Sequence, residues 1–242
     1  MYVNTSVAWE SLSLSERNLL FKVYRFVGYN SLILNFDYSP NKDYRKQLRE
    51  IKEEEKLDIH GKIIISPKTQ KSLKKSLNIL KNFSDFLICV NCVDKDLLTL
   101  AINDSRVDLI SFPSIRDLSH VTSGIISLLK SQKKFLEFSF RDVIRSATHE
   151  RSRLFHEIDK FLHIVSNNTQ ILLYGGCERS IYEIRGPREI ATIFTAIFDL
   201  PHQTSKKIVQ SNPEQIIKNL VERKSTNHFP NGVKTISQEN KE

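Results

Sequence analysis

Short apolar runs alternate along this chain with longer segments in which apolar residues recur every three or four positions. The short runs predict buried strands, and the longer segments predict amphipathic helices. Because the two patterns alternate throughout, we expect a parallel sheet whose strands are joined by crossover helices. The expected strands are residues 5–9, 31–36, 62–66, 86–90, 108–112, 135–140 and 171–174.

Several helix ends carry their own sequence signals. Ser13 with Glu16 three residues later is a capping-box pattern, and Gly28 favours the end of the helix that starts there. Asp94 is expected to cap a short helix that ends near residue 103. Pro187 stands at the first position of the helix that follows the last strand, where proline is favourable. The other helices are expected at about 42–57, 73–80, 119–129, 141–165 and 212–223.

The helical segments also predict which apolar side chains form stripes. The stripe of the first helix comprises Leu19, Leu20, Val23, Phe26 and Val27. The last helix is expected to turn Ile216, Ile217, Leu220 and Val221 inward.

Seven strands with crossover helices fit either an open doubly wound sheet or an incomplete eight-stranded barrel. No Gly-x-Gly-x-x-Gly loop follows any strand, so the phosphate-binding turn of doubly wound nucleotide-binding sheets is missing. The strands are also evenly spaced, which is typical of a β/α barrel. We therefore expect an α/β fold, an incomplete TIM-like (β/α) barrel of about seven parallel strands. One domain should span residues 1–223, followed by a disordered polar tail at 224–242.

The charge composition indicates which kinds of partner the chain can bind. The 242 residues include 36 lysines and arginines against 28 acidic residues, a net charge of +8. This balance favours an anionic partner such as RNA, DNA or acidic lipid, although an inert basic surface is the alternative. No apolar run approaches the ~20 residues of a membrane span, and no signal-peptide pattern is seen at the start. Three cysteines fit a reduced, cytoplasmic protein.

In a β/α barrel, function is located at the C-terminal ends of the strands. A hydrolytic metal site needs clustered His, Asp and Glu, and the histidines are expected on helices, loops and the tail instead. Glu137 and Asp37 are a possible carboxylate pair, but Glu137 is equally expected as a hydrogen-bonded structural residue. We therefore expect neither a catalytic nor a metal site. The strand-end residues are Asn35, Asp37, Ser66, Asn91, Cys92, Ser111, Glu137, Ser139, Arg141, Tyr174 and Cys177.

Cysteine and histidine patterns each have a simple interpretation. Cys89 and Cys92 resemble half a metal knuckle, but with one such pair we expect buried free thiols. The histidines at 149, 156 and 163 share one side of a predicted helix, opposite its apolar stripe. We expect them to face solvent, with a partner surface as the alternative.

The loop after the last strand is rich in arginine. Gly175-Gly176 allow close backbone approach, and Arg179, Arg185 and Arg188 lie before or at a helix start. Such loops often hold phosphate in β/α barrels. We expect these arginines, with Arg141 at the sixth strand end, to contact RNA phosphate. The alternative is that Arg185 and Arg188 pair with Glu178, Glu183 or Glu189 and stabilise the fold.

Four segments together resemble one family in their order and spacing, over residues 2–223. They are GYNSLILNFDY (28–38), DLISFP (108–113), FLEFSFRDVIRSATHERSRL (135–154) and ILLYGGCERSIYEIRGPREIATIFTAIFDLP (171–201). They are similar to archaeal ribonuclease P protein component 3, the thirty-kilodalton subunit family shared with eukaryotic ribonuclease P and MRP. The chain departs from the family at Asn4, where aspartate is usual, and at residues 174–177, where a Ser-Ser-Gly-Ala turn is usual.

This resemblance implies an incomplete barrel related to the polymerase and histidinol phosphatase superfamily, without its metal-binding histidines. It implies an accessory subunit of an endoribonuclease whose RNA removes the 5′ leader of precursor tRNA. The implied partners are ribonuclease P RNA, a small ferredoxin-like protein subunit and other ribonuclease P proteins, with no cofactor. Two alternatives stay open: a metal-dependent phosphoesterase with a degenerate barrel site, and a protein-only scaffold.

Overall fold

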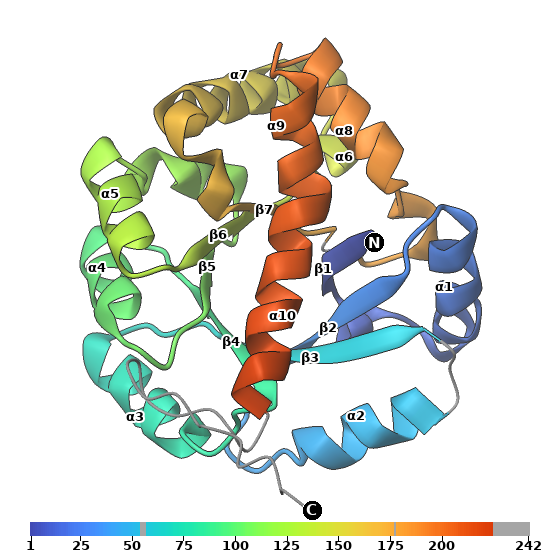
Figure 1. Ribbon diagram of the computed structural model, residues 1–242, viewed down its shortest axis with the longest axis vertical. Helices are drawn as coiled ribbons and strands as arrows, with labels where there is room; N and C mark the ends of the chain where they lie inside the picture. Colours follow the sequence, from blue (N-terminus) through green and yellow to red (C-terminus); the bar gives the residue numbers. More distant parts are fainter. Residues whose placement is uncertain (54–56, 177, 225–242) are drawn as a thin grey trace, which may run out of the picture.

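A computed structural model describes residues 1–53, 57–176 and 178–224 of the chain (Figure 1). Its seven strands form one sheet in chain order, and every neighbouring pair is parallel. The sequence prediction of seven parallel strands is confirmed. The strands are β1 (Val3–Val7), β2 (Ser31–Asp37), β3 (Asp58–Ile65), β4 (Phe86–Asn91), β5 (Leu109–Ser111), β6 (Phe135–Phe138) and β7 (Leu172–Tyr174).

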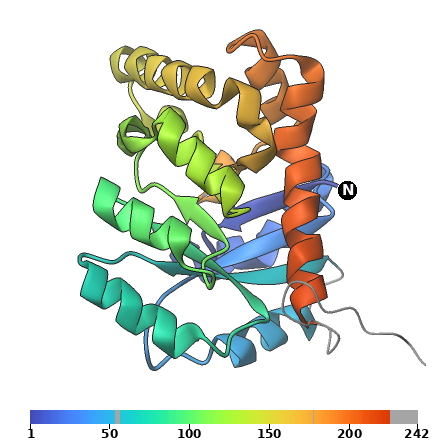
Figure 2. The ribbon, with the colours of Figure 1, turned by 60° about the vertical axis from the view of Figure 1, so that its left-hand side comes forward.

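Helices follow the strands and surround the sheet, as Figure 1 and Figure 2 show. The α-helices are α1 (Leu14–Phe26), α2 (Tyr44–Glu53), α3 (Gln70–Leu80), α4 (Lys95–Asn103), α5 (Ser123–Ser131), α6 (Arg141–Arg145), α7 (Thr148–Val165), α8 (Pro187–Ala196), α9 (His202–Lys206) and α10 (Asn212–Lys224). Short 3-10 or π turns are η1 (Trp9–Ser11), η2 (Ile115–His120), η3 (Ser166–Ile171), η4 (Ile181–Glu183) and η5 (Lys207–Ser211).

The sheet curls until its first and last strands meet. β1 lies beside β7, and Val7 forms an isolated parallel bridge with Glu178, four residues beyond the end of β7. The expected incomplete TIM-like barrel is therefore correct, and the seven strands close it almost completely.

Helix α10 fills the N-terminal end of the barrel. Ile216, Ile217 and Leu220 on this helix are buried against the inward side chains of the strands. Arg223 then fixes the last turn, because its guanidinium donates to Asp108 Oδ1 at 2.8 Å and to the Phe86 carbonyl at 2.7 Å. Figure 1 shows α10 lying across the barrel opening. The inward strand residues that it covers include Val3, Ile33, Leu87, Leu109, Phe135 and Leu173.

The other half of the barrel interior is polar. Lys62 on β3 is fully buried, and its Nζ lies 2.6 Å from Glu137 Oε2 on β6. The same Nζ donates to the Thr5 carbonyl on β1 at 2.8 Å, and the Thr5 hydroxyl donates to Glu137 Oε1 at 2.6 Å. A buried charge is tolerable only when it is paired and hydrogen-bonded. This network therefore ties together three strands that are not neighbours in the sheet.

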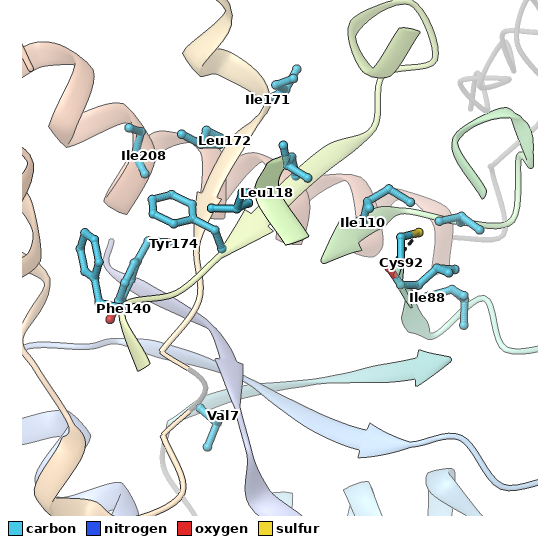
Figure 3. Close-up of a cluster of buried hydrophobic side chains, with 14 of the residues drawn as sticks. Val7, Ile88, Cys92, Ile110, Leu118, Phe140, Ile171, Leu172, Tyr174 and Ile208 are labelled. Atoms are coloured by element: carbon cyan, nitrogen blue, oxygen red, sulfur yellow. Dashed lines mark hydrogen bonds between the residues drawn. The ribbon is translucent and has the colours of Figure 1, made fainter. Parts of the chain in front are cut away.

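Outward strand residues pack under the surrounding helices. Figure 3 shows Leu172, Tyr174, Phe140 and Ile208 in one region of this layer and Ile88, Ile110 and Cys92 in another. Rings of Phe140 and Tyr174 are 5.5 Å apart between centroids. Because aromatic side chains bury large apolar areas, such contacts hold the helices on the sheet.

Strand β3 begins four residues earlier than expected. The segment before Lys62 contains Gly61, which reads as a strand breaker. A Cβ at residue 61 would lie 2.3 Å from the Phe86 ring, so glycine lets that ring pack against the strand. The early start places His60 in a strand and corrects the expectation that the histidines lie on helices, loops and the tail.

Three apolar residues are not buried as expected. Phe26 and Leu19, both in the predicted stripe of the first helix, are 91% and 47% exposed, and Val221 is 51% exposed. Leu20 and Leu220 are buried, so the stripes of both helices are narrower than predicted. The expected tail lies outside the described residues, apart from Lys224, at the end of α10.

The ion pair of Lys62 and Glu137 is open to a direct test. We expect Lys62→Met to lower the free energy of unfolding by about 3–5 kcal/mol, because the carboxylate is left buried and uncompensated. The double variant Lys62→Met/Glu137→Leu should lose less than the sum of the two single changes. Urea unfolding measures all four proteins, with exposed Lys160→Met as the control. Additive losses would show that the two charges do not depend on each other.

Candidate RNA-contact site at the barrel mouth

A cavity of about 280 Å³ opens at the C-terminal ends of the strands. It brings together six of the predicted strand-end residues and Arg141, while Ser66, Cys92 and Tyr174 do not line it. Cys177 lies outside the described residues. The six are Asn35, Asp37, Asn91, Ser111, Glu137 and Ser139.

Polar side chains at the cavity bond mainly to one another. The Asn35 amide donates to Ser6 Oγ at 2.8 Å, and the Asn91 amide donates to Ser66 Oγ at 3.1 Å. The Ser111 hydroxyl donates to Asn91 Oδ1. Asn35 Oδ1 is buried and has no hydrogen-bond partner among the described parts of the chain. These groups form a hydrogen-bonded polar set within a lining that also includes Ile64, Phe112 and Phe138.

The two carboxylates singled out from the sequence have different surroundings. Glu137 is 2% exposed, and its carboxylate accepts hydrogen bonds from Lys62 and Thr5. Asp37 is exposed at the rim. A catalytic carboxylate pair needs both groups facing the reacting atoms. Of the two interpretations, the structural role of Glu137 is the one that its contacts support.

Within residues 1–53, 57–176 and 178–224, no three His, Cys, Asp or Glu side chains gather as a possible metal site. His60 is buried near the other end of the barrel, where its Nε2 lies 2.8 Å from Asp58 Oδ2. His149, His156 and His163 are all exposed on α7, as expected from their spacing.

The two thiols that the structure describes are buried and free. Cys89 Sγ lies 3.0 Å from Ser111 Oγ, and Cys92 Sγ donates to the Val90 carbonyl at 3.8 Å. Burial raises the pKa of the Cys92 thiol well above its usual value, which disfavours the reactive thiolate. Both observations confirm the prediction of two structural cysteines.

Of the four predicted arginines, two meet at the cavity. Arg179 is exposed, and Arg141 is half-buried with its guanidinium donating to the Pro113 carbonyl at 2.9 Å. The backbone N–H of Arg179 donates to Glu183 Oε2 at 3.0 Å, which fixes the loop at this residue. Arg179 lines the cavity, and its guanidinium has no hydrogen bond within the described residues, so it can reach an anion at the mouth.

The other two arginines lie where the chain enters α8. The Arg185 guanidinium donates to the carbonyls of Tyr182 and Ile184 at 3.0 and 2.9 Å, so it stabilises the loop. Arg188 is exposed in the first turn of α8. Neither arginine forms an ion pair with a carboxylate in the described part of the chain, so the alternative pairing with nearby glutamates is not observed. Those glutamates bond instead to Tyr24 and Asn4, to Arg145, and to the backbone of Gly186.

The loop after β7 that carries Arg179 and Arg185 is called the arginine loop below. A buried cluster behind it was not predicted from the sequence. The Tyr24 hydroxyl donates to Glu178 Oε2 at 2.8 Å, and the Asn4 amide donates to the same carboxyl at 3.3 and 3.4 Å. Asn4 Oδ1 accepts from the backbone N–H groups of Ser6 and Gly176 at 3.0 and 3.1 Å. This cluster joins β1, α1 and the loop after β7, and so closes the barrel between its first and last strands.

The same cluster explains why residue 176 is glycine and why the pKa of Glu178 is raised. A Cβ at Gly176 would lie 1.9 Å from Glu178 Oε1, so a larger residue there would force the buried carboxyl group to move. Burial raises the pKa of Glu178 to about 7, against its usual 4.5.

Glu178 should give the folded protein a pH-dependent stability. Between pH 4.5 and about 7 the folded state holds one proton that the unfolded state releases. The contribution of Glu178 to the free energy of unfolding is therefore full below pH 4.5 and declines as pH rises through about 7. We expect the stability of the wild type relative to Glu178→Gln to fall across this window, measured by urea unfolding. Glu50→Gln, at an exposed site, should show no such trend, and a flat difference for Glu178→Gln would contradict the assignment.

Comparisons with known proteins place this geometry in a family context. No curated protein matches the chain. Among solved structures, a chain of the cryo-EM structure of archaeal ribonuclease P with mature tRNA is similar in fold, with a TM-score of 0.79 and 15% identity, covering 99% of this chain and 100% of that chain. A chain of the crystal structure of Plasmodium falciparum HPPK-DHPS has a TM-score of 0.42 and 13% identity, covering 85% of this chain and 49% of that chain, and we base no conclusion on it.

No helix in the described residues is both long enough and apolar enough to span a membrane. The family model described as ribonuclease P subunit p30 matches residues 1–225. That range contains every strand and helix of the barrel. The chain therefore belongs to the ribonuclease P subunit p30 family.

Proposed function

We propose that this chain is an accessory protein subunit of ribonuclease P, the ribonucleoprotein that removes the 5′ leader of precursor tRNA. The match of the subunit p30 family over residues 1–225 carries the proposal. The similar archaeal structure is a ribonuclease P with mature tRNA, which supports the same assignment. In this proposal the RNA performs the cleavage, and the protein acts in the cytoplasm without a cofactor.

The chemistry of the chain supports an accessory role. Its net charge of +8 can offset phosphate repulsion in a large folded RNA. Glu137 at the mouth is already neutralised by Lys62, so the barrel end presents hydrogen-bonding groups and arginines to a partner. The partners in this proposal are ribonuclease P RNA, a small ferredoxin-like protein subunit and other ribonuclease P proteins.

Reconstitution tests the function directly. Ribonuclease P RNA with its other protein subunits should cleave precursor tRNA at lower magnesium concentration when this chain is present, because protein cations replace part of the metal screening. The chain without RNA should cleave neither precursor tRNA nor simple phosphoesters when divalent metal is added. Equal magnesium dependence with and without the chain would contradict the proposal. Metal-dependent turnover by the chain alone, lost in Asp37→Asn, would favour the phosphoesterase alternative.

The four arginines give a prediction about RNA contact. We expect Arg179→Ala and Arg188→Ala each to reduce the salt dependence of RNA binding by about one unit of slope, because each removes one phosphate contact. Arg185→Ala and Arg141→Ala should also lower thermal stability, since both side chains donate to backbone carbonyls. Arg153→Ala, on the exposed face of α7, is the control of equal charge. If all four variants keep the wild-type slope, the loop is structural and the RNA surface lies elsewhere.

A further inference from the structure

Helix α3 and the loop before it are basic throughout. Between Ser66 and Lys81 the chain has five lysines and no aspartate or glutamate. All five are exposed in the structure. We call this set the α3 lysine face: Lys68, Lys71, Lys74, Lys75 and Lys81.

The lysines lie on the side of α3 that faces away from the barrel. Successive helical residues are rotated by about 100°, so Lys71, Lys74 and Lys75 fall together on one side. Leu73 and Leu77 on the opposite side are fully buried under the helix. The three lysine side chains within α3 therefore form a single outward surface rather than a ring around the helix.

These lysines are unpaired in the described part of the chain. Some exposed cations on other helices do have carboxylate partners: Arg45 on α2 binds Asp85 at 2.8 Å, and Lys160 on α7 lies 3.6 Å from Glu157. No lysine of the α3 lysine face lies within ion-pair distance of a carboxylate among the described residues. The positive charge of this face is thus not neutralised by its own fold.

Local energetics disfavour the arrangement. Lys71 and Lys75 are four residues apart on the helix, a spacing at which like charges repel. Lys71 also lies in the first turn, where the helix dipole favours negative charge. The repulsion and the helix dipole both act against folding. The lysines are therefore better explained by a role of their charge in binding.

The face is remote from the arginine loop. Figure 1 and Figure 2 show α3 and α8 on opposite flanks of the barrel. A ligand that binds both surfaces must pass around the molecule or present two separate segments. A large folded RNA meets this condition, whereas a small anion does not.

We propose that the α3 lysine face binds the phosphate backbone of RNA, as a second contact surface separate from the arginine loop. The inference deepens the proposed function and rests on it, because the RNA is identified by that function. Flexible lysines contact phosphate as point charges, without base readout. The protein therefore holds two segments of RNA at a fixed separation, one on each flank.

The salt dependence of binding to a short RNA duplex of mixed sequence tests the face. The variant Lys71→Gln/Lys74→Gln/Lys75→Gln should reduce the slope of log affinity against log salt by about two to three, at roughly 0.7–0.9 per lost phosphate contact. The control Lys130→Gln/Lys160→Gln/Lys218→Gln removes the same charge from three different helices and should leave the slope near the wild-type value. The melting temperature of the α3 variant should equal or exceed that of the wild type, because the repulsion is relieved.

Each outcome decides the proposal. An unchanged slope in the α3 variant, an equal reduction in the control, or a wild type that does not bind the duplex overturns it. In the last case, tighter binding of an acidic protein subunit by the wild type than by the α3 variant would identify a protein contact instead. The reconstitution assay is independent: a chain that fails to support ribonuclease P RNA but shows the expected slope change refutes the proposed function and retains the RNA-binding face.

Discussion

The buried ion pair between Lys62 and Glu137 is the interaction on which the rest of the barrel depends. A seven-stranded parallel barrel must fill its interior, and here the half nearest the mouth contains a buried ion pair among polar side chains. Such a pair is tolerated only with complete hydrogen bonding, which Thr5 supplies from a third strand. The positions of β1, β3 and β6 are therefore coupled to one another. The polar groups that remain available at the mouth are those that form no bond in this network.

Closure with seven strands depends on two further devices. Helix α10 covers the apolar end of the barrel, and the cluster of Asn4, Tyr24 and Glu178 joins the first strand to the segment after the last. Together they replace what an eighth strand would contribute, namely apolar cover at the N-terminal end of the barrel and hydrogen bonds along the seam between β1 and β7. The arginine loop begins directly at this seam, so its backbone starts from a fixed point.

The sequence predicted the features that depend on local signals. Caps at Ser13 and Asp94 are present because the side-chain to backbone bond forms within three residues. Features that depend on distant partners were missed. Gly61 is a strand residue only because the Phe86 ring packs on it, and Lys62 is internal only because Glu137 lies opposite. Most of the strand-end residues do line the mouth, since parallel strands necessarily place their ends together, but the rule could not reveal that Glu137 is already bound by Lys62 and Thr5.

The order of synthesis gives the α10 plug a further consequence. The helix that covers the apolar end of the barrel comes after all seven strands in the chain, so ribosomes produce the strands before it is available. Until then the inner apolar residues at that end, including Leu87 and Phe135, lack their cover. An emerging chain with uncovered apolar surface is prone to wrong association. The barrel is thus complete only when α10 docks, which couples closure of its apolar end to its competence for assembly.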